Sequence, residues 1–361
     1  MDRVLLFIIL TLTVFGLIMV ASAGVFYATT RFGDPNYFIK HQFLYGFLLG
    51  MPVLYLFSKI DYHFWKKVSV PMFLLSLIGL VLVFIPGIGS NAYGASRWIN
   101  LGPISFQPSE MVKLSLILYL GAWLESRGGE KIKDIYEGML PFLFILAVAG
   151  FLIIKQPDTG TLGVIILIAM SMFFVSGANI AHIFTMFAVG GLGLAILIAV
   201  APYRMNRFLV FLNPEHDPQG VGYQINQALL AIGSGGIFGL GLGHSRQKFN
   251  FLPEPIGDSI FAIIGEELGL LGAGIVVILF TLFALRAIKI AKNAPDDFGK
   301  IVAVGIVAWV VFQAFVNIAA ITALMPLTGI PLPFISYGGT SFIFLMAAMG
   351  ILLNISKQSK I

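Results

Sequence analysis

Apolar runs of about 20 residues alternate with short polar stretches along the whole chain. A helix of about 20 apolar residues is long enough to cross roughly 30 Å of hydrocarbon. We therefore predict an all-α membrane protein with about ten transmembrane helices. Their ranges are 4–27, 38–57, 68–86, 106–125, 138–154, 161–177, 180–201, 259–285, 300–324 and 336–355.

The composition agrees with this pattern. Hydrophobic residues make up 58% of the 361 residues, charged residues make up 11%, and the mean hydropathy is +0.95. Soluble domains are about half apolar and a quarter charged, so we expect residues 1–361 to form a single polytopic membrane domain. The apolar run at 4–27 is longer than the core of a secretory signal peptide and is expected to be a retained helix.

The distribution of lysine and arginine predicts the orientation. With a cytoplasmic N-terminus, 13 of the 22 Lys and Arg residues fall on the inner side and eight on the outer side, while Lys113 lies within a span. The positive-inside rule then places both termini in the cytoplasm. The net charge of +5 is explained by this topology and by contact with anionic membrane lipid, without a nucleic-acid partner.

One outer connection, residues 202–258 between helices seven and eight, is much longer than the others. Long connections in compact domains are usually functional. Within it, residues 223–232 have a helical pattern and residues 233–243 are rich in glycine, which permits close approach of the backbone. Any chemistry is therefore expected at the outer face.

The stretch 222–269 concentrates ionisable side chains at the mouth of helix eight. Such groups are costly to desolvate, so they indicate a functional site. Asp258 lies where the loop becomes a helix, and it either caps that helix or carries out chemistry. Glu266 and Glu267 lie deeper, roughly 12 Å along the axis, and are expected to belong to a polar network that positions the loop. The ionisable residues are Arg246, Lys248, Glu254, Asp258, Glu266 and Glu267.

A second polar stretch, residues 94–113, is expected to be an irregular loop that precedes a helix beginning near Pro108. Proline suits the first turn of a helix. Glu110 and Lys113 share one face of that turn and are expected to form an ion pair. Arg97 beside Trp98 indicates either contact with a lipid phosphate or simple anchoring at the interface.

Three further stretches lie near the outer face by this topology. Asp158 and Thr159 are plausible helix caps, and Lys155 ends the preceding helix. Arg204 and Arg207, three residues apart, either clamp a pyrophosphate or contact headgroups. Residues 325–340 are uncharged and rich in glycine, proline and hydroxyl groups, including Ser336 and Tyr337, a pattern typical of backbone that lines a cavity.

Other motifs are missing or have simpler explanations. The five histidines lack the spacing of a metal site, and there is no nucleotide-binding loop, so no nucleotide cofactor is expected. Two pairs of glycines four residues apart, Gly46 with Gly50 and Gly265 with Gly269, are typical of closely packed helices.

Taken together, these stretches resemble the SEDS family (shape, elongation, division and sporulation) of membrane-embedded peptidoglycan glycosyltransferases. The resemblance covers nearly the whole chain and rests on five motifs in order. Within the family it is greater to the division branch, FtsW, than to the elongation branch, RodA, because of the segments NPEHDPQGVGYQINQ, LPEP and LLNIS. The motifs are GASRWINLGPISFQPSEMVK, KQPDTGT, GYQINQALLAIGSGGIFGLGLG, QKFNFLPEPIGDSIFAIIGEELG and PLTGIPLPFISYGGTS.

The resemblance implies an enzyme that polymerises lipid II into β-1,4 glycan strands at the outer face of the cytoplasmic membrane. It also implies a class B penicillin-binding protein, a transpeptidase, and other division or elongation machinery as partners. Asp258 matches the family's essential acidic residue, and Arg97, Glu110 and Lys113 match other motif positions. Two positions depart from the family pattern: Ser96 replaces the first of two arginines before Trp98, and the family's Thr-Asp-Phe is Gly-Asp-Ser at 257–259.

The chemistry of such an enzyme assigns roles to these residues. An inverting transfer from a polyprenyl pyrophosphate needs a base for the acceptor hydroxyl and positive charge for the leaving group. Asp258 is expected to be that base or to bind Mg²⁺ or another divalent cation. Candidate phosphate-binding residues are Arg97, Lys113, Lys155, Arg204, Arg207, Arg246 and Lys248, and candidate supporting residues are Trp98, Glu110, Asp158, Glu266, Glu267, Ser336 and Tyr337.

Two other functions remain compatible with the sequence. A flippase of the same lipid-linked precursor would also need broken helices and intramembrane carboxylates. A non-catalytic scaffold for a penicillin-binding protein would need only the helix surfaces.

Overall fold

The computed structural model describes residues 1–92, 95–102, 104–249 and 251–359, which are mainly helical. The first half contains α1 (Arg3–Phe32), α2 (Tyr37–His41), the π-helical turn η1 (Gln42–Phe47), α3 (Leu48–Lys59), α4 (Tyr62–Leu82), α5 (Pro108–Arg127), α6 (Gly129–Lys133), the π-helical turn η2 (Ile135–Met139), α7 (Leu140–Lys155) and α8 (Thr159–Val175). The second half contains α9 (Ile180–Val200), α10 (Pro202–Leu212), the 3₁₀ turn η3 (Pro214–His216), α11 (Val221–Gly235), α12 (Ile260–Lys292), α13 (Asp297–Ile321) and α14 (Gly339–Gln358).

Each of the ten predicted spans coincides with a helix or with consecutive helices. In the described part of the chain, seven helical segments are long and apolar enough to cross a membrane, and α8 is apolar but shorter. The structure therefore agrees with a multi-pass α-helical membrane protein, and the number of ten crossings stays a prediction. The seven segments are α1, α4, η2 with α7, α9, α12, α13 and α14.

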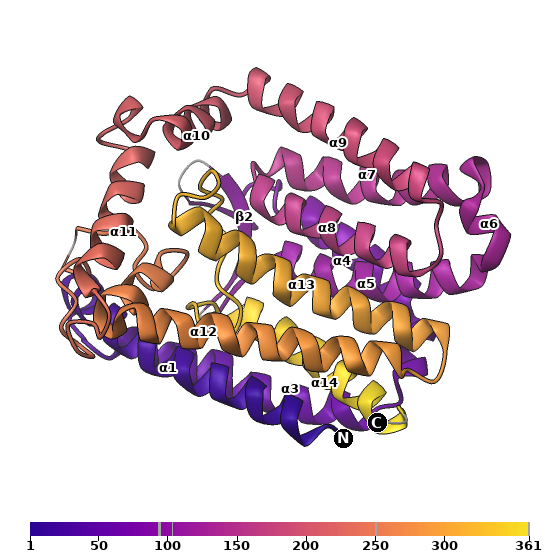
Figure 1. Ribbon diagram of the computed structural model, residues 1–361, viewed down its shortest axis with the longest axis horizontal. Coiled ribbons are helices and arrows are strands. Elements are labelled where there is room, and N and C mark those ends of the chain that lie inside the picture. The colour runs from indigo at the N-terminus through magenta and orange to yellow at the C-terminus, as the bar shows by residue number, and fades with distance from the viewer. Residues whose placement is uncertain (93–94, 103, 250, 360–361) are drawn as a thin grey trace.

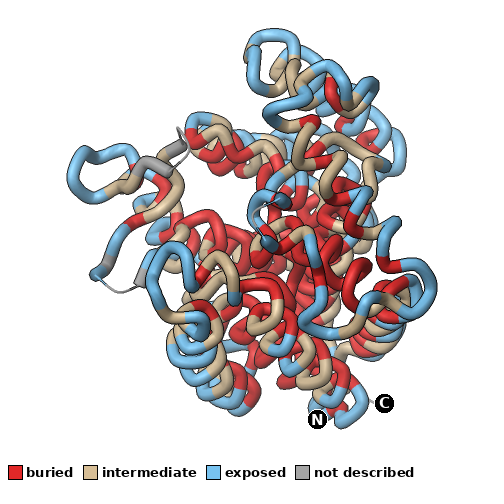
Figure 2. Tube along the Cα trace, turned by 90° about the vertical axis from the view of Figure 1, so that its left-hand side faces the viewer, coloured by how far each residue is buried: buried red, intermediate tan, exposed pale blue. Residues whose placement is uncertain are grey.

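The helices lie side by side in one bundle (Figure 1). Both termini lie at one end, which we call the terminal end, and α10, α11 and β2 lie at the opposite end, which we call the loop end (Figure 1). The helices α13 and α14 form the centre, since 72% and 78% of their most apolar windows are buried, against 11% for α9. Figure 2 shows the buried residues gathered in the middle.

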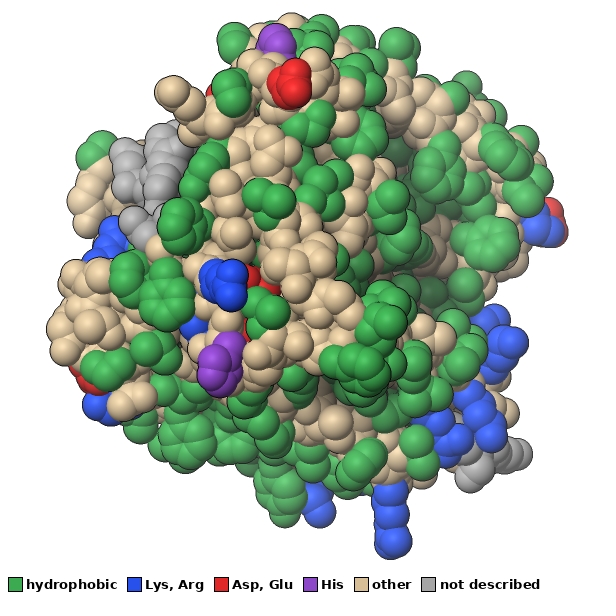
Figure 3. All heavy atoms as spheres, turned by 60° about the vertical axis from the view of Figure 1, so that its left-hand side comes forward, with side chains coloured by type: hydrophobic (Ala, Val, Ile, Leu, Met, Phe, Trp, Pro, Cys, Tyr) green, Lys and Arg blue, Asp and Glu red, His purple; other side chains and the backbone are tan. Residues whose placement is uncertain are grey.

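The outer surface of the bundle carries many large apolar side chains. On the face in Figure 3, hydrophobic side chains and uncharged atoms predominate, and Lys and Arg gather at the lower right. Apolar side chains that point away from a protein core are suited to contact with lipid hydrocarbon. The surface thus agrees with the apolar runs from which the spans were predicted.

A small antiparallel sheet lies before α5, where we predicted an irregular loop. Its strands are β1 (Gly89–Ala92), β2 (Ala95–Leu101) and β3 (Ile104–Phe106), in the order β1-β2-β3. Pairing gives the backbone of this segment the hydrogen bonds that a loop near a membrane lacks. The prediction of an irregular loop is thus wrong for the strands, while Gly94 and Pro103 of that stretch lie outside the described residues.

Other boundaries also differ from the prediction. α4 begins at Tyr62, before residue 68, because Asp61 accepts a hydrogen bond from the backbone N–H of His63 (2.8 Å). α12 continues to Lys292, past residue 285, with basic residues in its last turn, where they interact favourably with the helix dipole. The long connection holds two helices, of which α11 contains the predicted 223–232 and α10 was not predicted.

The glycine-rich segment crosses α12 at a break in that helix. Gly269 has φ +66° and ψ −167° inside α12, a conformation that glycine adopts without strain. The break frees two carbonyl groups and two N–H groups of α12, and the crossing segment binds all four. These bonds join Leu240 N to Glu266 O (2.9 Å), Gly241 N to Glu267 O (3.0 Å), Leu270 N to Gly236 O (2.9 Å) and Leu271 N to Ile237 O (3.2 Å).

Changing Gly269 to Ala is expected to destabilise the protein. A Cβ atom there would lie 2.4 Å from the backbone nitrogen of Gly239, and a non-glycine residue with this φ costs about 1–3 kcal/mol. Thermal unfolding in detergent should show a melting temperature several degrees lower. Gly274→Ala is the matched control, because the Cβ of Gly274 would meet open space; equal melting temperatures for the two variants would mean that the crossing tolerates a side chain at residue 269.

Candidate functional site

Asp258 lies at the loop end, directly before α12, but it does not cap that helix. The N-cap residue is Ser259, and its side chain makes no capping hydrogen bond. The carboxylate of Asp258 instead lies 3.4 and 3.5 Å from Nε2 of Gln224 in α11. The interpretation of Asp258 as a helix cap is therefore wrong.

Three successive carbonyl groups hold the backbone at this point. The backbone N–H of Tyr337 donates to Ile256 O (2.9 Å), and the hydroxyl of Ser336 donates to Gly257 O (2.7 Å). The carbonyl of Asp258 itself accepts from Nδ2 of Asn317 (2.8 Å). Asp258 thus stands on a fixed backbone, to which the segment before α14 and the C-terminal part of α13 both contribute.

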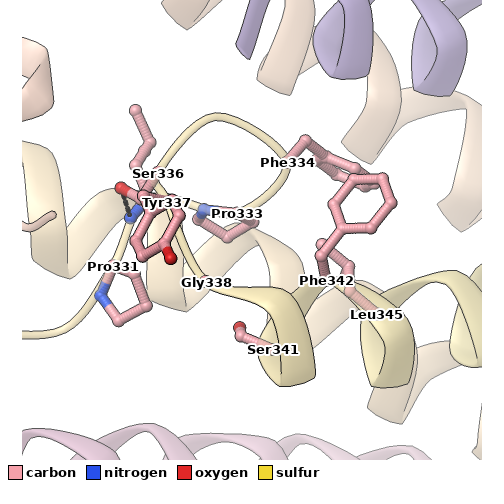
Figure 4. Close-up of a pocket in the computed structure, with 10 residues that line it drawn as sticks. Pro331, Pro333, Phe334, Ser336, Tyr337, Gly338, Ser341, Phe342 and Leu345 are labelled. Atoms are coloured by element: carbon pink, nitrogen blue, oxygen red, sulfur yellow. Dashed lines mark hydrogen bonds between the residues drawn. The ribbon is translucent and has the colours of Figure 1, made fainter. Parts of the chain in front are cut away.

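The segment between α13 and α14 forms one wall of two small pockets. Asp258, Asn317 and residues 327–330 line the first of them. The second is lined by residues 331–338 and the start of α14. In Figure 4, Tyr337 lies beside Pro331 and Pro333, and Phe334 lies beside Phe342. The prolines and glycines of this segment thus shape a cavity wall, as predicted.

The environment of Asp258 suits a general base. Burial of the carboxyl group, together with the charge of Glu254, raises the pKa of Asp258 to about 6, although Gln224 and Arg207 act in the opposite direction. A base whose pKa lies slightly below neutral pH is ionised at pH 7 and still accepts a proton readily.

Arg207 lies near this carboxylate, and Arg97 lies near Arg207. Arg207 of α10 donates to Leu327 O (3.2 Å) and to Thr328 O (3.5 Å) on the pocket wall. Burial and then the charge of Arg97 lower the pKa of Arg207, whereas the charges of Asp258 and Asp158 raise it. Arg97, Asp158 and Asp258 therefore each lie close enough to Arg207 to act on its charge.

Arg97 reaches this region from β2. Its Nε donates to Gln156 O (3.1 Å), and its NH2 donates to Pro157 O. Asp158, which follows, is the N-cap of α8 and accepts from Thr161 N (3.3 Å), so its predicted capping is confirmed. Trp98 is paired with Ser90 across the sheet.

The predicted ion pair between Glu110 and Lys113 is confirmed. The Lys113 ammonium lies 2.8 Å from the Glu110 carboxylate, and each side chain is 2% exposed. Lys113 also donates to Gln313 Oε1 (2.8 Å) and lies over the ring of Trp309. In this arrangement a carboxylate neutralises the lysine, so the structure does not present it as a free cation.

Lys248 is likewise buried against a carboxylate. Its ammonium lies 2.9 Å from Glu267 and 2.7 Å from Gly243 O. Glu267 also accepts from Ser22 of α1, and Glu266 accepts from the Ser245 hydroxyl (2.5 Å). The predicted polar network that positions the loop is therefore present, and it contains Lys248.

The other three candidate cations are Lys155, Arg204 and Arg246. Lys155 is exposed and lies over the ring of Phe151, and Arg246 is exposed. Arg204 donates to Leu197 O (3.1 Å) and lies over the ring of Tyr203. Among the described residues, Arg207 is the candidate that combines carbonyl partners with a position near Asp258, and Arg97 has carbonyl partners and lies near Arg207.

Three amide side chains of the site were not predicted from the sequence: Gln224 of α11, and Gln313 and Asn317 of α13. The last two are isolated amides one helical turn apart in an otherwise apolar span, and each is 2% exposed. Since polar side chains inside a membrane helix are rare and usually functional, this spacing was a usable signal.

No group of three or more His, Asp or Glu side chains gathers within the described residues to hold a metal. Near Asp258 the other oxygen and nitrogen groups include the amides of Gln224 and Asn317, the hydroxyls of Ser259 and Thr328, and backbone carbonyls. This donor set fits a hard cation such as Mg²⁺ only if water or a phosphate supplies most of its ligands.

Comparison with known proteins gives matches over the full length. The family model for FtsW, RodA and SpoVE, described as cell cycle proteins, matches residues 2–361. Stage V sporulation protein E of Bacillus subtilis (strain 168) is 43% identical over 359 residues, which is 99% of this chain and 98% of that protein. The probable peptidoglycan glycosyltransferase FtsW of Geobacter sulfurreducens (strain DL-1 / KN400) is also 43% identical over 359 residues, 99% of this chain and 96% of its own.

Solved structures share the fold. A chain from a structure on the coordination of polymerization and crosslinking by a peptidoglycan synthase complex has a TM-score of 0.79 at 26% identity, and the match covers 99% of this chain and 97% of that one. The rod shape determining protein RodA of Thermus thermophilus has a TM-score of 0.72 at 25% identity, with coverage of 100% and 98%. The resemblance found in the sequence is thus confirmed, and the chain belongs to the FtsW/RodA/SpoVE family of cell cycle proteins.

Proposed function

We propose that this protein is a peptidoglycan glycosyltransferase that polymerises lipid II into β-1,4 glycan strands, in cell division or cell-shape maintenance. The observation that carries the proposal is the position of Asp258, whose backbone is held through the carbonyls of 256–258 and whose carboxylate lies near Arg207. Arg97 lies near Arg207, and both arginines donate to carbonyl oxygens. Full-length similarity to relatives named peptidoglycan glycosyltransferases supports it.

The reaction would proceed by direct displacement. The acceptor hydroxyl oxygen attacks the anomeric carbon, the bond from that carbon to the pyrophosphate oxygen breaks, and the pyrophosphate leaves with the bonding electrons. Asp258 takes the proton of the hydroxyl as general base. Arg97 and Arg207 stabilise the negative charge of the leaving group, because guanidinium groups bind phosphate oxygens in pairs.

The position of the site relative to the two termini indicates how the protein is oriented in the membrane. Both termini lie at the end of the bundle opposite α11 (Figure 1), and the Asp258 carboxylate lies beside Gln224 of α11. The positive-inside rule assigns the termini to the cytoplasm. We infer that the protein resides in the cytoplasmic membrane with the site facing outward, where its lipid-linked substrate is used. The partner is a class B penicillin-binding protein, as the match to a chain from a polymerising and crosslinking synthase complex supports, together with other division or elongation machinery.

Substitution of Asp258 by Asn is expected to abolish glycan synthesis, because the amide cannot accept the proton; loss of a general base costs on the order of 10²–10⁴ in rate. The purified chain, with and without its penicillin-binding partner, would receive lipid II, and glycan length would be read on a gel. Glu215→Gln, the same change at an exposed residue of the outer connection, should polymerise normally. Normal polymer from the Asp258 variant would sink the assignment. Lipid transfer across vesicles without any polymer from the wild type would favour the flippase.

The rate of polymerisation should rise with pH around a midpoint near 6, because the base acts only when ionised and its pKa is about 6. Glu254→Gln removes a negative charge that raises this pKa, so the midpoint should move to lower pH. Initial rates measured from pH 5 to 8 would test this, with Glu215→Gln as the variant that leaves the midpoint unchanged. A flat profile, or a shift to higher pH in Glu254→Gln, contradicts the role of Asp258 as base.

A divalent cation is the second role open to Asp258. The carboxylate would be its main protein ligand, and the bound ion would supply positive charge to the pyrophosphate. If this role holds, a chelator should stop polymerisation and Mg²⁺ should restore it. Electron paramagnetic resonance with Mn²⁺ and lipid II should then detect bound metal in the wild type and much less in Asp258→Asn. Full activity in the chelator would leave Asp258 as base alone.

A further inference from the structure

Two buried amide side chains connect α13 to the region of Asp258. Gln313 and Asn317 lie one turn apart, in a helix whose apolar window is 72% buried, and each is 2% exposed. A buried amide is costly unless it forms hydrogen bonds. The partners of these two groups therefore indicate why they are there.

Gln313 joins the ion pair of α5 to the pocket segment. Its Oε1 accepts from Lys113 Nζ and from Trp309 Nε1, both at 2.8 Å. Its Nε2 donates to Pro331 O (2.9 Å). Gln313 thus fixes the segment that follows the first pocket.

Asn317 joins Asp258 to the same segment. Its Nδ2 donates to Asp258 O and to Ile330 O, both at 2.8 Å. Since both partners are carbonyl oxygens, which only accept, the NH₂ group of the amide must face them. A single side chain therefore holds the backbone of the acidic residue and the opposite wall of the pocket that both residues line.

Few side chains can replace this contact. An amide offers two N–H donors in one plane, whereas serine offers one donor and an ionised aspartate offers none. Without both bonds, two buried carbonyls lose a partner, and the backbone at 258 is free to move relative to residue 330. A displacement of about 1 Å in a reacting group reduces rates on the order of 100-fold.

We propose that Asn317 is a positioning residue of glycosyl transfer, which sets the distance and angle between the Asp258 carboxylate and a substrate held against residues 327–330. This inference rests on the proposed function and deepens it. On this proposal Asn317 affects kcat, whereas other groups determine the affinity for lipid II.

Asn317→Ala tests the proposal, with Asn354→Ala as matched control. Asn354 of α14 is also a buried asparagine, 4% exposed, whose amide donates to a backbone carbonyl in the last turn of α3, Ser58 O (3.0 Å), and accepts from Tyr62 N (3.0 Å). Both variants should lose stability, but Asn317→Ala alone should lose roughly 10- to 100-fold in kcat with little change in KM for lipid II. Equal kcat in the two variants at temperatures where both are folded would overturn the proposal.

Aspartate at the same positions gives a second readout, and it serves if the alanine variant fails to fold. Asn317→Asp puts a carboxylate next to Asp258, and a like charge raises the pKa of a neighbouring acid. The pH midpoint of polymerisation should rise in Asn317→Asp and stay unchanged in Asn354→Asp. An unchanged midpoint together with an unchanged kcat would reject Asn317 as a positioning residue.

The two levels of inference fail in different ways. If the wild type makes no polymer from lipid II with its partner present, the proposed function fails. If the wild type makes polymer and Asn317→Ala makes it at the wild-type rate, the function stands and the role of Asn317 is rejected.

Discussion

Hydrogen bonds to the carbonyl groups of non-helical backbone are the constraint on which the loop end depends. An unpaired backbone group near hydrocarbon costs several kcal/mol, so the stretches 256–258 and 327–331 need partners from other elements. Those partners are a backbone N–H and four side chains, and they come from three elements distant in sequence. The donors are Tyr337 N, Ser336, Asn317, Arg207 and Gln313. The hydrogen bonds that pair these backbone groups are therefore the same ones that fix the position of Asp258.

The lysines and the arginines at the loop end have different partners. Lys113 and Lys248 each face a buried carboxylate, so their positive charge is cancelled and they hold elements together. Arg97 and Arg207 donate to carbonyl oxygens, which orient a guanidinium and leave its charge in place. Removing one member of a buried ion pair would leave the other charge buried without a partner. A defect in a lysine variant therefore indicates lost structure more readily than lost phosphate binding.

The sequence predicted the parts of this site that depend on local pattern. Apolar length marked the helices, Pro108 marked the start of α5, and the spacing of Glu110 and Lys113 predicted their ion pair. It failed where a residue's partner is remote in the chain. Nothing near Lys248 indicates that it meets Glu267 through the crossing at Gly269, and the strands before α5 depend on pairing between short segments of ambiguous pattern.

The same arrangement couples the base to its substrate. The positive charge of Arg207 lowers the pKa of Asp258, against burial and Glu254, which raise it. On the proposed function, a pyrophosphate bound at Arg207 cancels part of that positive charge and adds negative charge nearby, and both effects raise the pKa of a carboxylate. Asp258 would thus become a stronger base when the donor is bound, so that proton transfer is favoured once the leaving group is in place.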